Sequence, residues 1–167
     1  KNPRFAYIAP TFKQAKSIAW DYMKQFTAKI PHTKFNETEL RVDLPNGSRI
    51  TLLGSENSDG LRGIYLDGCV IDEYANVNER LFPEIIRPAL SDRKGYCVFI
   101  GTPQGMNNNF YELYQHAQGA EDWFNYKAKA SETKIVDNEE LVKAKEVMGE
   151  KKYLQEFECD WIANIEG

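Results

Sequence analysis

The chain has 167 residues, a length that suits one globular domain with its own apolar core. Hydrophobic residues make up 42% and charged residues 28%, a balance that excludes a disordered or fibrous chain. The apolar runs are far shorter than the roughly 20 residues that cross a bilayer, so we expect no membrane association. The three cysteines are far apart and only two histidines are present, which predicts free thiols in a reducing compartment and no zinc site.

Charge is distributed unevenly along the chain. The net charge of −4 is not that of a typical nucleic-acid-binding domain. Residues 1–50, however, carry nine Lys and Arg against four Asp and Glu, whereas residues 51–167 carry twelve against twenty-one. The first fifty residues are compatible with a solvated lysine-bearing helix or with a basic face for a polyanion.

The hydrophobic pattern of the first half predicts a strand, a helix and a hairpin. Residues 5–9 form a short apolar run that Pro10 ends, as expected of a buried strand. Alternating apolar residues at 40–44 and 50–52 flank an Asn-Gly turn, which predicts a β-hairpin. Between the strand at 5–9 and this hairpin, helical spacing predicts a helix with one buried face. That face is formed by Ala15, Ile18, Ala19, Tyr22, Met23 and Phe26.

The second half continues the alternation of strands and helices. Buried strands are predicted at residues 69–71 and 96–100, after an exposed loop at 54–63 and on either side of a helix near 79–91. Further along, the pattern predicts a helix over 110–117, a last strand over 123–130, a helix capped by Asn138 and closed by Gly149, and an aromatic-rich segment at 153–161.

Apolar strands that alternate with helices predict an α/β fold, with a mostly parallel sheet covered by helices on both faces. In such sheets ligands bind beyond the carboxyl ends of the strands. The strand at 69–71 ends in Asp72 and Glu73, of which the first is suited to hold Mg²⁺ and the second to activate a water that attacks a phosphate. The alternative is an ordinary acidic strand end that precedes a helix.

Two further residues are candidates for work on a phosphate. Thr102 follows the strand at 96–100, where a hydroxyl can sense a γ-phosphate, although Gly and Pro beside it also fit a plain turn. Arg62 lies between glycines on the loop and could act as an arginine finger in a neighbouring subunit, or simply pair with a nearby acid. None of the eleven glycines is followed by Lys, so these residues contain no P-loop.

Five segments in this order resemble the ATPase domain of the large subunit of tailed-phage DNA-packaging terminases. The segments are residues 7–16, 60–63, 69–73, 100–103 and 153–161. The resemblance implies a P-loop NTPase-like α/β fold with a β-hairpin insertion, and it covers nearly the whole chain. It also implies a partial ATPase domain at residues 1–150 and a linker or lid segment at 151–167.

The resemblance implies a role for each candidate residue. Glu73 would be the catalytic base, Asp72 would support Mg²⁺, Thr102 would couple ATP hydrolysis to movement, and Arg62 would be the trans-acting finger. ATP and Mg²⁺ are the implied cofactors. The implied partners are double-stranded DNA, the portal protein, the small terminase subunit and further copies of the chain in a ring, in the cytoplasm of the host cell.

The family pattern is incomplete in these residues. Its Walker A strand is expected before Lys1 and its nuclease domain after Gly167, so we expect these 167 residues alone to be inactive. Because the resemblance implies that the P-loop strand lies beside residues 69–71, we expect a gap there, filled by another chain or by rearranged pairing.

Three other functions stay open at this stage. One is a helicase-like ATPase, and the second is a non-catalytic fragment that binds DNA or an assembly partner. The third is a two-metal nuclease built from Asp67, Asp72 and Glu73. It is the weakest, because nuclease carboxylates usually come from separate elements.

Overall fold

The computed structural model describes residues 2–163. The chain forms two compact units, Lys1–Gly101 and Thr102–Gly167. The boundary between the units lies at Thr102, whereas the expected functional division at residue 150 stays a prediction. Among the described residues, no helix has the length and apolar character needed to cross a membrane.

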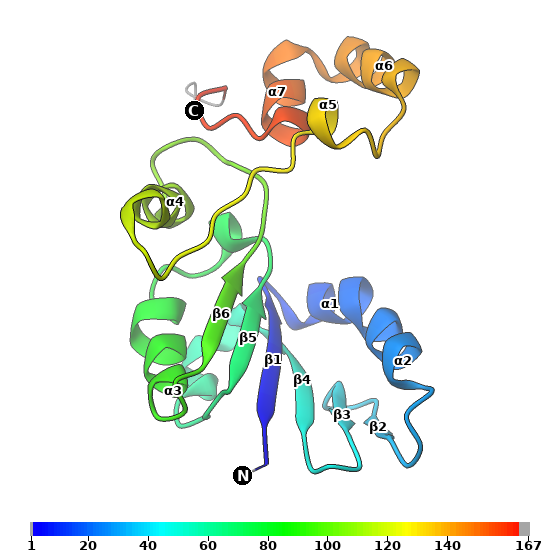
Figure 1. The fold of residues 1–167 in the computed structure, drawn as a ribbon, viewed down its shortest axis with the longest axis vertical. Coiled ribbons are helices and arrows are strands. Elements are labelled where there is room, and N and C mark those ends of the chain that lie inside the picture. Colours follow the sequence, from blue (N-terminus) through cyan, green and yellow to red (C-terminus); the bar gives the residue numbers. More distant parts are fainter. Residues whose placement is uncertain (1, 164–167) are drawn as a thin grey trace. The chain divides into compact units, whose positions relative to one another are not determined.

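All six strands of the described residues lie in the first unit and form one sheet (Figure 1). Its strand order is β2-β3-β4-β1-β5-β6. The parallel strands are β1 (Arg4–Ala9), β4 (Arg49–Gly54), β5 (Gly68–Ile71) and β6 (Tyr96–Phe99). The short strands β2 (Lys34–Asn36) and β3 (Arg41–Asp43) add antiparallel pairs at one edge. The predicted mostly parallel sheet is thus confirmed.

The predicted hairpin is formed by β3 and β4. Gly47 has a φ of +83°, a left-handed conformation that favours glycine, and Asn46 Oδ1 accepts a hydrogen bond from the Ser48 amide at 3.0 Å. The second strand of the hairpin also pairs with β1 along its whole length. The hairpin is therefore continuous with the main sheet.

The first helix comprises α1 (Phe12–Ala15), a π-helical turn at Lys16–Trp20 and α2 (Asp21–Thr27). Thr11 caps it, with a reciprocal hydrogen-bond pair to Gln14. The predicted buried face is wrong in part, because the side chains of Ile18, Tyr22 and Phe26 are 42%, 61% and 74% exposed. The π-helical turn changes the angular spacing of residues, and Trp20 is buried instead.

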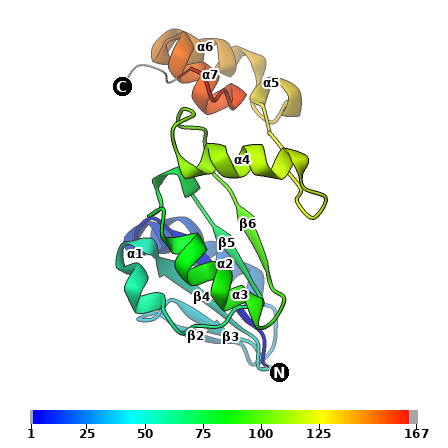
Figure 2. The same cartoon turned by 90° about the vertical axis from the view of Figure 1, so that its left-hand side faces the viewer.

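Helices cover both faces of the sheet, as predicted (Figure 2). On one face the helix after β1 covers an apolar core of Ala9, Ala15, Trp20, Leu40, Val42 and Leu52. On the other lies the helix predicted near residues 79–91, a π-helical turn at Phe82–Ile86 followed by α3 (Arg87–Ser91). Its Phe82 ring packs edge-on against Phe99 of β6, with centroids 4.7 Å apart.

The loop predicted at residues 54–63 is only partly irregular. A 3-10 helix, Ser55–Leu61, replaces part of it.

The expected gap beside residues 69–71 is wrong. β5 pairs with β1 on one side and with β6 on the other, and Ile8 lies directly opposite Ile71. The exposed position is instead that of β6, which is the last strand of the sheet within the described residues. Its Tyr96 and Val98 side chains are 60% and 42% exposed, so the prediction of a buried strand at 96–100 is also wrong.

The second unit is helical in the residues that the structure describes. It contains α4 (Asn109–Gly119), α5 (Ala130–Thr133), α6 (Asn138–Met148) and α7 (Glu150–Glu158). Buried Trp161 packs against three aromatic rings of α4, with centroids 5.2–5.4 Å away: Phe110, Tyr111 and Tyr114.

Two local predictions in this unit need correction. The strand expected at residues 123–130 does not form, and Phe124 and Tyr126 are 87% and 71% exposed. An apolar run becomes a strand only when a neighbouring strand takes up its backbone hydrogen bonds, and none of the described strands does so. The cap of α6 is Asp137, whose carboxylate accepts from the Glu139 amide, and not Asn138. Gly149 ends α6, as predicted.

Candidate functional site

The acidic pair lies where β5 ends. The Asp72 amide still donates to the Ile8 carbonyl of β1, at 2.8 Å, so Asp72 continues the parallel ladder. Glu73 then adopts a left-handed conformation, with φ 50° and ψ 45°. The Tyr74 amide donates to the Ile100 carbonyl at 3.1 Å, which ties the following turn to the end of β6. A left-handed non-glycine residue costs about 1 kcal/mol or more, so two neighbouring strands hold Glu73 in a strained turn.

The carboxylate of Asp72 is held by two donors. Its Oδ1 accepts from the Glu73 amide at 2.8 Å, and its Oδ2 accepts from the hydroxyl of Tyr7 on β1. Burial, then the hydrogen bond to Asp72 and the charges of both acids, raise the pKa of Tyr7 well above its ordinary value. Tyr7 is therefore a constant donor. Each carboxylate oxygen keeps a lone pair beyond these bonds, which fits a ligand for Mg²⁺ or its water shell.

Tyr7 is a residue that the reasoning from sequence missed. It belongs to the segment 7–16, but the sequence pattern assigns it no role of its own. Its contact with Asp72 joins residues 65 apart in the chain. Only the register of β1 against β5 could have revealed it, because Tyr7 lies opposite Val70, two residues before Asp72.

Arg62 lies just beyond the 3-10 helix and pairs with acids of its own unit. Its Nε is 3.1 Å from Asp59 Oδ1, and one terminal nitrogen is 3.3 Å from Glu84 Oε2. Arg80 binds the same Glu84 carboxylate, and hydrogen bonds from Arg80 and Arg62 lower the pKa of Glu84. The Arg62 side chain is 51% exposed. In this structure it therefore occupies a surface ion-pair network, one of the two alternatives that its sequence context allowed.

Thr102 is the first residue of the second compact unit. Two residues earlier, the Ile100 amide donates to the Ile71 carbonyl at 3.0 Å, so the chain leaves the sheet beside the end of β5. Its expected role in sensing a γ-phosphate stays a prediction.

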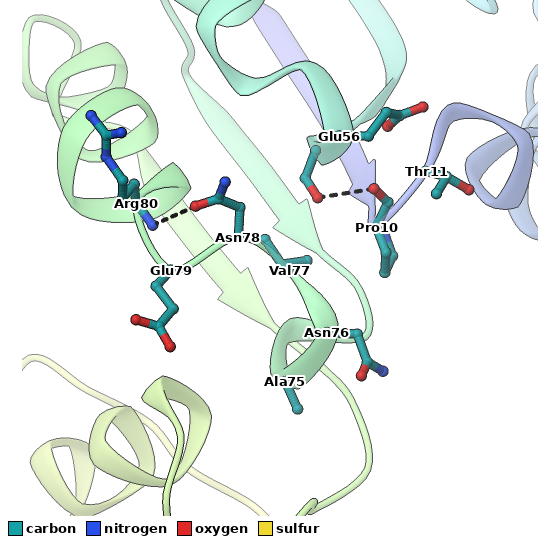
Figure 3. A pocket seen from close by; sticks show the side chains of 10 residues that line it. Pro10, Thr11, Glu56, Ala75, Asn76, Val77, Asn78, Glu79 and Arg80 are labelled. Carbon is teal, nitrogen blue, oxygen red and sulfur yellow. Dashed lines mark hydrogen bonds between the residues drawn. The ribbon is translucent and has the colours of Figure 1, made fainter.

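An open cleft of about 670 Å³ lies at the carboxyl end of the sheet (Figure 3). It is lined by Pro10 and Thr11 after β1, Ser55 and Glu56 after β4, and residues 75–80 after the acidic pair. Ser55 Oγ donates to the Pro10 carbonyl at 3.0 Å, and the Arg80 amide donates to Asn78 Oδ1 at 3.0 Å. The cleft has a mixed polar lining with both signs of charge. The sequence predicted ligand binding at this end of the sheet, but none of these lining residues was among its candidates.

The nuclease hypothesis is wrong for these residues. Asp67 precedes β5, accepts from the Arg4 amide at 2.8 Å and pairs with Arg93 at 3.4 Å. Asp72 follows β5, so a strand of four residues, at about 3.3 Å each, separates the two carboxylates. In the described part of the chain, no group of three or more His, Cys, Asp or Glu side chains is placed to hold a metal ion.

Comparison with solved structures shows which class of domain has this fold. The ATPase domain of the Thermus phage P74-26 large terminase matches 96% of the chain, with a TM-score of 0.80 and 22% identity, and the match covers 77% of that domain. The large terminase of a thermophilic bacteriophage, in complex with ADP, matches 97% of the chain with a TM-score of 0.77 and 14% identity, over 41% of its own length. The fold is that of large terminase ATPase domains.

Sequence comparison then gives the family. The model for the N-terminal part of the T4-like-virus type of terminase large subunit matches residues 1–164, and the chain belongs to this family. The terminase large subunit of Thermus phage G20c is 29% identical in an alignment over 126 residues, and this match covers 64% of the chain. The chain spans about a quarter of that relative, since the match covers 26% of its length.

Proposed function

We propose that the chain is part of the ATP-hydrolysing motor that drives double-stranded DNA into phage procapsids. The observation that carries this proposal is the acidic pair Asp72–Glu73 at the end of β5. Glu73 adopts a strained left-handed turn there, and the Tyr7 hydroxyl donates a hydrogen bond to Asp72. The family and the fold support it. The large terminase of the thermophilic bacteriophage has been solved with ADP and with ATP-γ-S, which supports a nucleotide as the ligand here.

The two carboxylates have distinct roles in this proposal. Asp72 holds Mg²⁺ through the lone pairs that Tyr7 and the Glu73 amide leave open. Glu73 orients the attacking water and accepts its proton, as a carboxylate base does in phosphoryl transfer. When bound, Mg²⁺ neutralises charge on the β- and γ-phosphates.

The phosphates themselves need a cradle from outside these residues. No glycine of the chain is followed by Lys, so the backbone amides and lysine of a P-loop must come from another segment. We place the strand that carries this loop beside β6, because β6 ends the sheet and exposes Tyr96 and Val98. Residues 1–167 alone are then inactive, and at most bind DNA or an assembly partner.

Arg62 and Thr102 complete the proposed machinery. As a trans-acting finger, Arg62 leaves its ion pairs with Asp59 and Glu84 and binds the phosphates of the nucleotide on a neighbouring subunit. Breaking these ion pairs costs little free energy, because exposed ion pairs typically contribute only about 0–1 kcal/mol. Thr102 senses the γ-phosphate and couples hydrolysis to movement. The remaining partners in this proposal are DNA, the portal protein and the small terminase subunit, with copies of the chain in a ring in the host cytoplasm.

The test is Glu73→Gln in the full-length subunit. Loss of the base is expected to lower the rate of ATP hydrolysis at least about a hundredfold while nucleotide binding persists. Glu146→Gln, on an exposed position of α6, makes the same change of charge and is the matched control. Equal turnover in the Glu73→Gln and control proteins would contradict the assignment. ATP-dependent unwinding of forked DNA without packaging would favour the helicase-like alternative.

A further inference from the structure

We propose that Tyr7 is a positioning residue for the metal-binding carboxylate: its hydroxyl fixes the orientation of Asp72 and thereby sets the affinity of the site for a divalent cation. This inference rests on the proposed function of Asp72. It assigns a role in the site to β1, a strand that contributes neither of the two acids.

The sheet register explains why a tyrosine is needed at this position. Tyr7 lies opposite Val70, and Asp72 follows two residues later on the same face, so the two side chains form a diagonal pair. The long side chain of a tyrosine spans the distance to this position on the neighbouring strand, and its hydroxyl donates to Asp72 Oδ2. Serine or threonine at position 7 would be too short to make the contact, and phenylalanine would lack the donor.

The two ends of the Tyr7 side chain have different surroundings. Its ring packs against the apolar core under the first helix, which includes Ala9 and Leu52. Its hydroxyl extends from this packed ring to Asp72 Oδ2. A ring held by packing has few rotamers, so the position of the hydroxyl is set before any ligand arrives.

The second oxygen of Asp72 is fixed from another direction. Oδ1 accepts from the Glu73 amide, which the left-handed turn presents to it. With one donor on each oxygen, the carboxylate plane cannot rotate without breaking a hydrogen bond. Without the Tyr7 hydroxyl, only the bond to Glu73 remains and the carboxylate can turn about its side-chain torsions. Partners that orient a ligating carboxylate typically contribute about tenfold or more in metal affinity.

The deciding experiment compares Tyr7→Phe with wild type in the full-length subunit. Binding of Mn²⁺, followed by electron paramagnetic resonance in the presence of ATP-γ-S, reports metal affinity without turnover. The expected result is about a tenfold weaker affinity for Mn²⁺, and a similar rise in the Mg²⁺ concentration that gives half-maximal hydrolysis. The ring stays, so the melting temperature is expected to change little. Tyr22→Phe, on the exposed helix face, removes a hydroxyl elsewhere and is the control.

A purely structural role predicts a different pattern. In that case Tyr7→Phe leaves the affinity for Mn²⁺ unchanged, and only Tyr7→Leu, which removes the ring, lowers the melting temperature. This result would overturn the inference whether or not the wild-type subunit hydrolyses ATP. Absence of hydrolysis in the wild-type full-length subunit would instead overturn the proposed function, so the two failures are distinguishable.

Discussion

The guanidinium of Arg62 and that of Arg80 bind the same carboxylate, that of Glu84. Arg62 lies 3.3 Å from Oε2, whereas Arg80 makes a two-pronged contact at 2.7 and 2.8 Å. The shorter pair joins residues four apart, Arg80 in the turn before the π-helical segment and Glu84 within that segment. Arg62 is therefore the more easily released of the two arginines, and Arg80 can keep Glu84 satisfied when Arg62 leaves.

This difference predicts that the two arginines have separate effects on activity. Arg62→Ala in the assembled full-length subunit is expected to lower ATP hydrolysis about a thousandfold, as loss of an arginine finger does. Arg80→Ala breaks a bond to the same Glu84 and is expected to leave hydrolysis within about twofold. Steady-state turnover of both variants checks this. The stability of both variants is expected to stay close to that of wild type, because the ion pairs are exposed.

A mixing experiment tests whether Arg62 acts between subunits. Subunits with Arg62→Ala keep Asp72 and Glu73, and subunits with Glu73→Gln keep Arg62. If the finger acts in trans, a mixture of the two is expected to recover part of the activity that each lacks alone. A mixture as inactive as its components would show that Arg62 works only within its own chain.

The sequence predicted the features of the fold that depend on neighbouring residues. The Asn46–Gly47 turn, the parallel strands and the placement of Asp72 and Glu73 at a strand end all follow from local patterns, and the structure contains each of them. The catalytic roles of the acids are a further step that stays a prediction.

The errors have physical causes that local patterns do not record. The π-helical turn at Lys16–Trp20 moves Phe26 to the surface, and periodicity with 3.6 residues per turn cannot anticipate it. The segments 96–100 and 123–130 have the apolar character of buried strands, yet burial depends on which strands lie beside them. The contact between Tyr7 and Asp72 was missed because it joins residues 65 apart in sequence and depends on the register between their two strands.

The hairpin turn gives a prediction about stability. Gly47 has a φ of +83°, and a Cβ there would lie 2.9 Å from Asn2 Oδ1. Gly47→Ala is therefore expected to lower the free energy of unfolding by about 1–2 kcal/mol, measured by urea denaturation. Gly119→Ala at the end of α4 is the control, since a Cβ there meets nothing within 4 Å. Equal effects of the two variants would contradict the argument from backbone strain.

The raised pKa of Tyr7 gives a prediction about pH. Burial and the acids at the strand end favour the neutral phenol in the folded state, whereas in the unfolded chain it ionises near its ordinary value of 10.0. Ionisation of Tyr7 thus has no effect on stability below pH 10, and the free energy of unfolding falls as the pH rises from there towards the folded pKa of Tyr7, because the unfolded chain releases the phenol proton first. In Tyr7→Phe, unfolding curves measured above pH 10 should decline less steeply with pH. Absorbance at 295 nm, which reports ionised phenols, should show that the folded variant has one tyrosine fewer than wild type among those that ionise well above pH 10.

The pair Cys69 and Cys97 predicts slow thiol chemistry. Their Sγ atoms lie 3.4 Å apart on paired strands, and their mutual hydrogen bond, followed by burial, raises the pKa of Cys97. Because the thiolate is the reactive form, alkylation of Cys97 by iodoacetamide at pH 8 is expected to be at least about tenfold slower in the native chain than in urea. Mass spectrometry of the tryptic peptides measures both rates. Cys69→Ala removes the hydrogen-bond partner and is expected to speed alkylation of Cys97 in the native state. An unchanged rate in that variant would assign the protection of Cys97 to burial alone.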